Sequence, residues 1–531
     1  MKHPKLALLI SAVLFASTSA HASDDNKATV DQVGNDNSVK ITQQVNSESN
    51  EATVSQTGNL NKAEVTQADT SNTKAFITQV GNENEGAISQ HNSTATALAT
   101  IVTEGSSNKA NIVQKYYNAQ SAAAAVNQVG DSNTATITQE NADGASSTIN
   151  QLGDGDTAEI NNYVSDFADA TINQSVGAGN NAYIEQDNSD GAEATISQAG
   201  AGNTGSIFQQ TDTLTDDASE DTVAVIDQSG DNNSADIVQT GLSNDAAVMQ
   251  MGNGNEAFVT QSNLNNMADV DQTGDSGWAT VMQSGVNAGA TIAQSDFNQT
   301  ATVTQSGDGQ MAFVTQSNAN NTATVTQSDM SNLATVNQAG NGDMATVVQT
   351  GISNEAVVEQ TEYSGSNTVS NTVSVYQTGN ENYAGAKTGY NANSTITITQ
   401  TGNNNTVTDN INAINFYGTG FGAGVWGSDN TVNVTQTGND NTAYAEGATN
   451  GSMVDIVQIG SLNEAIGESW DGSTNDLDIS QTGTEHFADV FISGSTNVIA
   501  VTQTDMGNNS SVNTFGNGNS VTINQGAVMM P

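Results

Sequence analysis

Apolar and polar residues alternate along most of this chain with a period of two, and the alternation is cut into short units. Between Gln239 and Gln360, glutamine recurs at a constant step, at positions 239, 250, 261, 272, 283, 294, 305, 316, 327, 338, 349 and 360. Alanine stands four residues before each of these glutamines, and valine or isoleucine stands two before. Residues two apart lie on one face of a β-strand, so these three positions share a face. Each unit therefore predicts a strand of about seven residues.

The residues that follow each glutamine predict a tight turn. From Gln239 to Gln349, Gly, Asn or Asp stands two positions after each glutamine, as at Gly241, Asn263, Asp296 and Gly351. These residue types tolerate a positive φ. Six residues before each glutamine Asn is common, and that position falls on the same strand face as the glutamine. Two strand–turn units of this length make one coil of a β-solenoid with about 22 residues.

A helix is the competing interpretation, because an eleven-residue repeat also suits a slightly right-handed coiled coil. Alternation at two, a glycine in nearly every unit, and abundant Thr, Val and Asn all oppose helix. The predicted fold class is therefore all-β: a β-solenoid with two short strands per coil and cross-β stacking along its axis.

The stacking of coils explains why glutamine recurs at the same position of every unit. Equal positions of successive coils lie about 4.8 Å apart, and a side-chain amide both donates and accepts, so Gln and Asn can form ladders. The alternative is a solvated surface glutamine, but the fixed phase with Ala and Val favours an inward ladder. The predicted ladder residues are Gln56, Asn61, Gln67, Gln128, Asn133, Gln139, Gln228, Asn233, Gln239, Asn244, Gln250, Asn255, Gln261, Gln305, Gln316, Gln327, Gln349, Asn354 and Gln360. The predicted turn glycines are Gly58, Gly130, Gly230, Gly241, Gly252 and Gly351.

The pattern extends beyond the regular tract 228–360 in both directions. Toward the N-terminus glutamine occurs at 32, 43, 56, 67, 79, 90, 114, 128 and 139. After 360 it continues at 377, 400, 436, 458, 481, 503 and 525, mostly once per coil, so one strand of each coil has lost its glutamine. The stretch 411–429 is rich in aromatic residues and glycine, and we expect it to be a loop that leaves the solenoid.

The N-terminus predicts export from the cytoplasm. Lys2 and Lys5 precede an apolar run, and the small residues end in Ala-His-Ala, so residues 1–22 are expected to be a signal peptide cut before Ser23. Residues 23–531 are then one repeat solenoid. No segment holds about 18 consecutive apolar residues, so no membrane span is expected. The chain has no cysteine, so disulfides cannot stabilise it.

The net charge of the chain limits the classes of partner that we expect. The net charge is −48, every basic residue is lysine, and beyond Lys115 the only one is Lys387. So acidic a chain repels nucleic acid and anionic lipid, and neither is expected as a partner. The same composition is also typical of disorder. Proline, however, occurs only at Pro4 and Pro531, as expected for a backbone that must pair its N–H groups continuously.

Catalytic chemistry has little support in the sequence. The mature chain has His91 and His486, with His21 added only if the cleavage site shifts. "GDSG" (274–277) and "GDGD" (153–156) occupy turn positions of the repeat. "GTGFGAG" (418–424) lacks the strand–helix context of a dinucleotide site. We expect no catalytic, cofactor or metal site.

The unit Gln-x-Gly-x-x-Asn-x-Ala-x-x-x-Gln resembles the curlin repeat of curli fibre subunits. It is unbroken at 56–67, 128–139, 228–239, 239–250, 250–261 and 349–360. The resemblance implies an extracellular functional amyloid of a Gram-negative-type bacterium, stacked end to end and serving as biofilm matrix and adhesin. It also implies three partners: the chain itself, a curli-type nucleator, and an outer-membrane secretion pore. This chain departs from the family in having several times more repeats, which begin almost directly after Ser23.

Two other functions stay open. A non-polymerising solenoid adhesin would use the variable outward side chains to bind surface or matrix ligands. An ice-binding solenoid would need a flat array of outward threonines. Phe258, Met282 and Val348 interrupt that array, whose members include Thr260, Thr280, Thr302, Thr304, Thr324, Thr326 and Thr346.

Overall fold

The computed structural model describes residues 25–44, 47–92, 96–115, 121–211, 222–361, 370–389, 393–408 and 421–526. The predicted signal peptide and most of the predicted loop lie outside the described residues. The described elements are all β-strands, and none of them is a helix. The predicted all-β class and the β-solenoid are confirmed. The chain forms two compact units, Met1–Leu264 (unit 1) and Asn265–Pro531 (unit 2).

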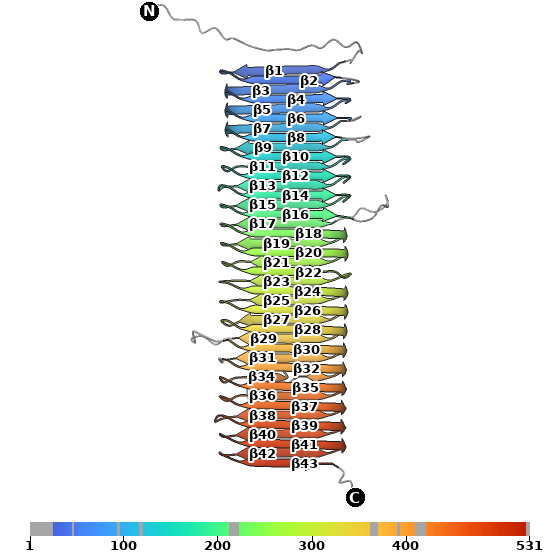
Figure 1. Ribbon diagram of the computed structural model, residues 1–531, viewed down its shortest axis with the longest axis vertical. Helices are drawn as coiled ribbons and strands as arrows, with labels where there is room; N and C mark the ends of the chain where they lie inside the picture. Colours follow the sequence, from blue (N-terminus) through green and yellow to red (C-terminus); the bar gives the residue numbers. More distant parts are fainter. Residues whose placement is uncertain are drawn as a thin grey trace, which may run out of the picture. The chain divides into compact units, whose positions relative to one another are not determined.

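In unit 1 the odd-numbered strands form sheet A and the even-numbered strands form sheet B (Figure 1). The strands of sheet A are β1 (Lys27–Val33), β3 (Glu51–Asn59), β5 (Lys74–Asn82), β7 (Leu98–Ser106), β9 (Ala123–Val129), β11 (Ser146–Gln151), β13 (Asp169–Ser175), β15 (Glu193–Ala199), β17 (Val223–Ser229) and β19 (Asp245–Met251). Those of sheet B are β2 (Ser38–Gln44), β4 (Lys62–Ala68), β6 (Glu85–His91), β8 (Lys109–Lys115), β10 (Thr134–Glu140), β12 (Thr157–Tyr163), β14 (Asn181–Asp187), β16 (Thr204–Gln210), β18 (Ser234–Leu242) and β20 (Glu256–Leu264).

Unit 2 repeats this arrangement. Its sheet A contains β21 (Met267–Gln272), β23 (Gly289–Gln294), β25 (Met311–Gln316), β27 (Leu333–Ala339), β29 (Glu355–Thr361), β31 (Tyr383–Gly389), β33 (Thr406–Val407), β34 (Ala423–Val425), β36 (Thr442–Gly447), β38 (Glu464–Trp470), β40 (Phe487–Ser493) and β42 (Asn509–Phe515). Its sheet B contains β22 (Trp278–Gln283), β24 (Thr300–Asp308), β26 (Thr322–Met330), β28 (Met344–Ile352), β30 (Thr372–Asn380), β32 (Thr395–Asn403), β35 (Thr431–Asn439), β37 (Met453–Ser461), β39 (Asp476–Thr484), β41 (Val498–Met506) and β43 (Ser520–Gln525).

Within each unit the pairing is parallel and keeps equal positions of the repeat together. In β24 and β26, for example, Val303 pairs with Val325 and Gln305 with Gln327. Within each unit, successive strands of the chain belong to different sheets and run in opposite directions, as the arrows in Figure 1 show, except that β33 and β34 both belong to sheet A. One coil therefore consists of one strand from each sheet and the two turns that join them.

The core of each coil lies between the two sheets and is built from small and β-branched residues. In β24, Ala301, Val303 and Gln305 are all 0% exposed, whereas Thr302 and Thr304 alternate with them and are half-buried. Alternation of this kind follows from the two-residue period of a strand. Burying each valine or isoleucine contributes about 1.5–3 kcal/mol, and the repeat supplies one in nearly every strand.

One rung of sheet A in unit 2 is assembled from two short strands. β33 and β34 both lie between β31 and β36: Thr406 pairs with Tyr383 and Thr442, and Gly424 pairs with Lys387 and Glu446. The chain thus leaves the sheet after Val407 and rejoins it at Ala423. Residues 423–425, which the sequence placed in the loop, are strand because they complete this rung.

Candidate assembly site: amide ladders and strand edges

The inward glutamines form continuous hydrogen-bonded columns. In sheet B of unit 2, Nε2 of Gln305 donates to Oε1 of Gln327 over 2.9 Å, and Gln327 donates in the same way to Gln349 over 2.8 Å. The direction is the same at every step, from the earlier coil to the later one. This column contains Gln283, Gln305, Gln327, Gln349, Gln377, Gln400, Gln436, Gln458, Gln481, Gln503 and Gln525.

The same amide also joins the two sheets. Nε2 of Gln305 lies 2.9 Å from the carbonyl oxygen of Gly289, and Nε2 of Gln327 lies 2.9 Å from that of Met311, both on the facing sheet. Both amide hydrogens are therefore used, one along the column and one across the coil. A buried polar group is stable only when it is hydrogen-bonded, and this geometry meets that condition in every rung where it recurs.

Columns of the same kind occur in both sheets of unit 1, interrupted at Thr103 and Asn162, and in sheet A of unit 2 as far as Gln360. Of the predicted ladder glutamines, Gln56 donates to Gln79, Gln67 to Gln90, Gln128 to Gln151, Gln228 to Gln250, Gln239 to Gln261 and Gln316 to Gln338. Gln139 accepts from Gln114, and Gln360 accepts from Gln338. The structure thus brings the predicted glutamines together as neighbours in columns.

The predicted asparagines form a second type of column at the turn before a strand. The backbone N of Asn354 donates to Oδ1 of Asn332 over 2.9 Å, while Nδ2 of Asn354 donates to the carbonyl oxygen of Gly379 over 2.7 Å. Asn61, Asn133, Asn233 and Asn255 bond in the same way to the preceding coil. Each asparagine thus links two coils and fixes the turn.

The turn glycines are required by close backbone approach. At Gly379, φ is +117°, and a Cβ would lie 1.9 Å from the carbonyl oxygen of Gly402 in the next coil. Gly58, Gly130, Gly230, Gly241, Gly252 and Gly351 all have positive φ as well. At Gly58 and Gly351 the atom in the way is again the next glycine's carbonyl oxygen. A side chain at these positions would separate the coils.

The columns change composition at Thr103, which the repeat did not indicate, and after Gln360, where the glutamine spacing predicted a loss from one strand of each coil. Thr103 occupies the glutamine position between Gln79 and Gln128. In sheet A of unit 2, Gln360 pairs with Thr388, and Thr388 in turn pairs with Val425. Later rungs of that column carry Gly447, Ser469, Ile492 and Thr514. The glutamine missing from the later coils is therefore missing from one sheet only.

Asp156 is an acidic residue in an asparagine column and is 0% exposed. Its backbone N donates to Oδ1 of Asn133, as an asparagine would. Burial raises the pKa of the Asp156 carboxyl, and hydrogen bonds from Asn180 oppose part of that rise. The sequence motif "GDGD" ends at this residue, so its last aspartate lies inside the coil.

Lysine and glutamate side chains on the outside of the first coils pair along the axis. Lys27 Nζ lies 3.0 Å from Glu51 Oε1, Lys40 Nζ lies 2.6 Å from Glu64 Oε1, and Lys62 pairs with Glu85. These pairs are well exposed, and each contributes at most about 1 kcal/mol. Their main effect is to neutralise the first coils of a strongly acidic chain.

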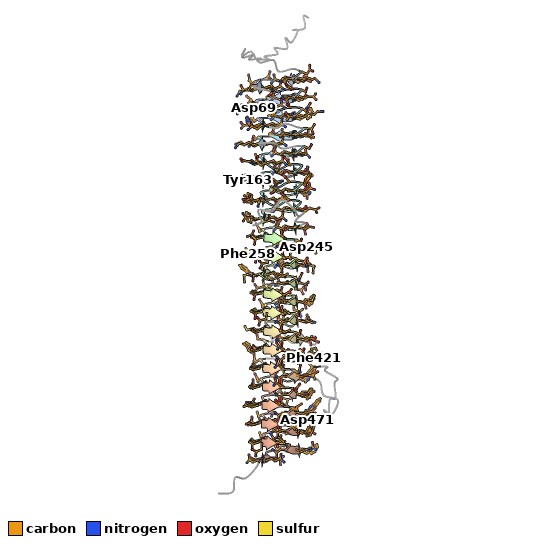
Figure 2. The ribbon with its side chains drawn as sticks, turned by 90° about the vertical axis from the view of Figure 1, so that its right-hand side faces the viewer. Asp69, Tyr163, Asp245, Phe258, Phe421 and Asp471 are labelled. Atoms are coloured by element: carbon orange, nitrogen blue, oxygen red, sulfur yellow. The ribbon has the colours of Figure 1, made fainter. Side chains whose placement is uncertain are left out.

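Lys387 is held more closely. Its Nζ lies 2.8 Å from Glu359 Oε1, 5.3 Å from the centre of the Phe421 ring and 6.0 Å from that of Trp426. Gly385 and Gly389 leave room for these rings, since a Cβ there would lie 3.3 Å from Phe421 and 2.7 Å from Trp426. Lys387 therefore anchors the segment that returns to β34, and Figure 2 shows Phe421 at the surface of unit 2.

The outward threonines of sheet B in unit 2 are partly in register. Thr280, Thr302, Thr324 and Thr346 form one column. The next column reads Met282, Thr304, Thr326, Val348 and Tyr376, and Met282 and Tyr376 are well exposed. Only two adjacent rungs of this run thus present a pair of threonines, which is a small flat area.

The turn motifs lie where the repeat predicted them. Gly274–Gly277 and Gly153–Asp156 are in turns between strands. No group of three or more His, Asp or Glu side chains suited to a metal ion occurs among the described residues. Within the same part of the chain, no helix is long and apolar enough to cross a membrane.

Comparison with known families identifies the repeat. Six segments match the model of the curlin associated repeat: residues 48–81, 230–262, 330–361, 427–460, 449–483 and 472–504. A search of curated proteins returned no match. The matched segments lie in both units and coincide with strand–turn–strand coils whose inward positions form the columns described above. These six matches, spread over both units, support this chain as a member of the curlin-repeat family.

Proposed function

We propose that this protein is a secreted, curli-like subunit that polymerises into extracellular amyloid fibres, which form biofilm matrix and mediate aggregation and adhesion. The observation that carries the proposal is the ladder itself. Backbone and side-chain amides hydrogen-bond each coil to the next along the axis, and Gln305–Gln327 is a typical step. The interactions that hold one chain together are thus the same ones that would join two chains.

Export and partners follow from the same proposal. Cleavage before Ser23 would release residues 23–531, which would cross the outer membrane through a curli-type pore and start growth on a curli-type nucleator. The structural columns, with Gln56, Gln239 and Gln327 among their members, supply the polymer core. The outward side chains are the part of the surface left for surface or matrix ligands.

The test is incubation of purified residues 23–531 at physiological salt, followed by electron microscopy and fibre diffraction. Fibres with an axial reflection near 4.7 Å are expected. Single particles that persist without that reflection would contradict polymerisation and favour the non-polymerising adhesin. A thermal-hysteresis assay on the same sample tests the ice-binding alternative, for which the interrupted threonine columns predict no activity.

A further inference from the structure

Within residues 25–526, the first and last described coils present complementary backbone edges. In the ladder, an outward residue of one coil directs its N–H to the next coil: Lys27 N donates to Asn50 O over 2.8 Å, and Phe487 N donates to Asn508 O over 2.9 Å. Inward residues direct theirs to the preceding coil. Among the described strands, β1 pairs only with β3, and β42 only with β40. The inward residues of β1 and the outward residues of β42 therefore present edges that fit each other.

The side-chain columns at the two ends continue one another. Nε2 of Gln525 donates to Asn509 O over 2.8 Å. In the rung before it, Gln503 makes the equivalent bond to Phe487 and uses its second amide hydrogen for Oε1 of Gln525. Gln525 thus offers a donor to a following coil. At the other end, Gln43 donates to Gln67 and carries the Oε1 that would accept from a preceding coil.

The asparagine column is also complementary at its two ends, but its hydrogen bonds run from the later coil to the earlier one. The backbone N of Asn519 donates to Oδ1 of Asn497 over 2.9 Å, and the backbone N of Asn61 donates to Oδ1 of Asn37 over 2.9 Å. Asn519 ends this column with an acceptor, and Asn37 begins it with a donor. Both residues stand directly before the sheet B strand of their coil.

The turn beside β42 shows which strand should follow it. At Gly494 a Cβ would lie 2.0 Å from the carbonyl oxygen of Gly516, and at Gly34 it would lie 1.7 Å from that of Gly58. At Gly516, which has φ +97°, the nearest atom to such a Cβ is 3.9 Å away. In other coils, the carbonyl oxygen of the next turn glycine fills the space that is open beside Gly516. In the first coil, Gly34 stands at this turn position, so Gly34 of a second copy could supply that carbonyl.

Charge and apolar surface favour the same junction. Residues 506–531 contain no charged side chain, and in β1–β2 with their turn Lys27 and Lys40 balance Asp31 and Asp36, although the whole chain carries −48. Phe515 is 70% exposed and Val33 is 51% exposed at the equivalent position. Val30, an inward residue, is 38% exposed in the first coil, whereas Val54 in the next coil is 0% exposed. Stacking would cover these side chains without bringing like charges together.

We propose that the last coil of one copy binds the first coil of a second copy in a single register, with β42 on β1 and β43 on β2. Gln525 then donates to Gln43, Phe515 covers Val33, and the junction repeats the contacts of an interior step. This inference rests on the proposed function and specifies the partner surface, the polarity and the register of the polymer.

Paired cysteines test the register, because the chain has no cysteine of its own. The proposed register places Ser511 over Thr29, about 4.8 Å apart. Fibres of the matched variant Ser511→Cys/Thr29→Cys, treated with a short bifunctional thiol reagent, are expected to give a ladder of covalent multimers on a denaturing gel. The mismatched control Thr522→Cys/Thr29→Cys places the thiols on different sheets and is expected to give none.

Each other result overturns the inference in a distinguishable way. Multimers from the mismatched pair alone would show a register rotated by half a coil. Dimers from a single-cysteine variant at the rate of the matched pair would show head-to-head or tail-to-tail contact. Fibres without cross-links in either pair would remove this register and leave the proposed function standing. Absence of fibres from every variant and from the unmodified chain would remove both.

A backbone variant tests the edge without cysteine chemistry. The N–H of Ser511 points to the open edge of β42, so Ser511→Pro removes no hydrogen bond within the chain. Seeded fibre elongation is expected to slow at least tenfold for Ser511→Pro and to stay unchanged for Ser511→Ala, with circular dichroism of the unpolymerised protein equal in both. Elongation of Ser511→Pro at the rate of Ser511→Ala would overturn the proposed edge.

Discussion

Both hydrogen bonds that Asn180 makes to Asp156 end on the same carboxylate oxygen: the backbone N lies 2.9 Å and Nδ2 lies 3.2 Å from Oδ1. Oδ2 has no hydrogen-bond partner among the described residues. It stands where an asparagine of this column carries its amide group, as Asn133 does when it donates to Gly153 O over 2.7 Å. An ionised carboxylate cannot make that bond.

We therefore predict that Asp156→Asn stabilises the protein at pH 7. Because burial raises the pKa of Asp156 in the folded state, the carboxyl favours folding below its unfolded pKa, and that contribution is lost as pH rises through the folded pKa. The gain from Asp156→Asn should shrink as pH falls toward 4. Urea unfolding of the unpolymerised variant and of the unmodified protein, each at pH 7 and near pH 4, measures this difference in the free energy of unfolding. The reverse exchange in the same column, Asn133→Asp, should destabilise at pH 7 and recover in acid. Equal effects at both pH values would contradict this account.

Breaking a glutamine column should destabilise several coils together. Gln327→Leu leaves an amide hydrogen of Gln305 and Oε1 of Gln349 without their partners in the buried core, and each buried unpaired group costs about 1–3 kcal/mol. Hydrogen exchange around β24, β26 and β28 is expected to accelerate accordingly. The neighbouring outward change Thr326→Val is the control and should leave exchange unchanged. Wild-type protection in Gln327→Leu would show that the ladder does not contribute to stability.

The stability lost when a turn glycine is replaced should depend on whether backbone atoms of the next coil lie against it. Gly379→Ala would place a Cβ 1.9 Å from Gly402 O, so the coils must separate there. We expect a loss of more than about 3 kcal/mol, at the upper end for single substitutions. Gly507 also has positive φ, but nothing lies within 4 Å of its Cβ position, so Gly507→Ala should cost only about 1 kcal/mol. Thermal unfolding of the two variants gives the comparison, and similar losses would argue for φ strain over steric contact.

Removing the Lys387 ammonium should loosen the segment before β34. Lys387→Gln loses the contact with Glu359 and the ring contacts with Phe421 and Trp426, worth about 1–2 kcal/mol together. Limited proteolysis near Phe421 should become faster. Lys115→Gln, which removes only an exposed pair with Glu140, is the matched control. Unchanged cleavage in Lys387→Gln would mean that the rings are held by the sheet alone.

Assembly should accelerate with ionic strength. Chains near −48 repel each other beyond the junction, and salt screens that repulsion over a Debye length of about 8–10 Å at 0.10–0.15 M. Fibre growth followed by light scattering from low to physiological salt is expected to become faster, with a shorter lag. Addition of divalent cations or acid should act in the same direction. A rate that does not depend on salt would show that charge does not limit the encounter.

Most of the fold could be predicted from the repeat. The glutamine that recurs every eleven residues identifies the inward positions of each strand, because the residues two and four before it lie on the same face. Ala301, Val303 and Gln305 could be assigned inward positions from spacing alone. The sequence could not show that Asp156 stands in an asparagine column, because the coils around it vary in length and their pairing emerges only in three dimensions. The same holds for the rung shared by β33 and β34, and for the rings around Lys387, which reach it across an insertion.

The uniform direction of the glutamine bonds has an electrical consequence. In a parallel sheet, neighbouring backbone amides point alternately up and down the stack, so their dipoles largely cancel. The side-chain amides do not alternate: from Gln283 to Gln525 each Nε2 points to the Oε1 that follows. An amide dipole is about 3.5 D, and each bond polarises the next. Each column is therefore a one-way chain of dipoles, which attracts an adjacent column most strongly when the two run antiparallel.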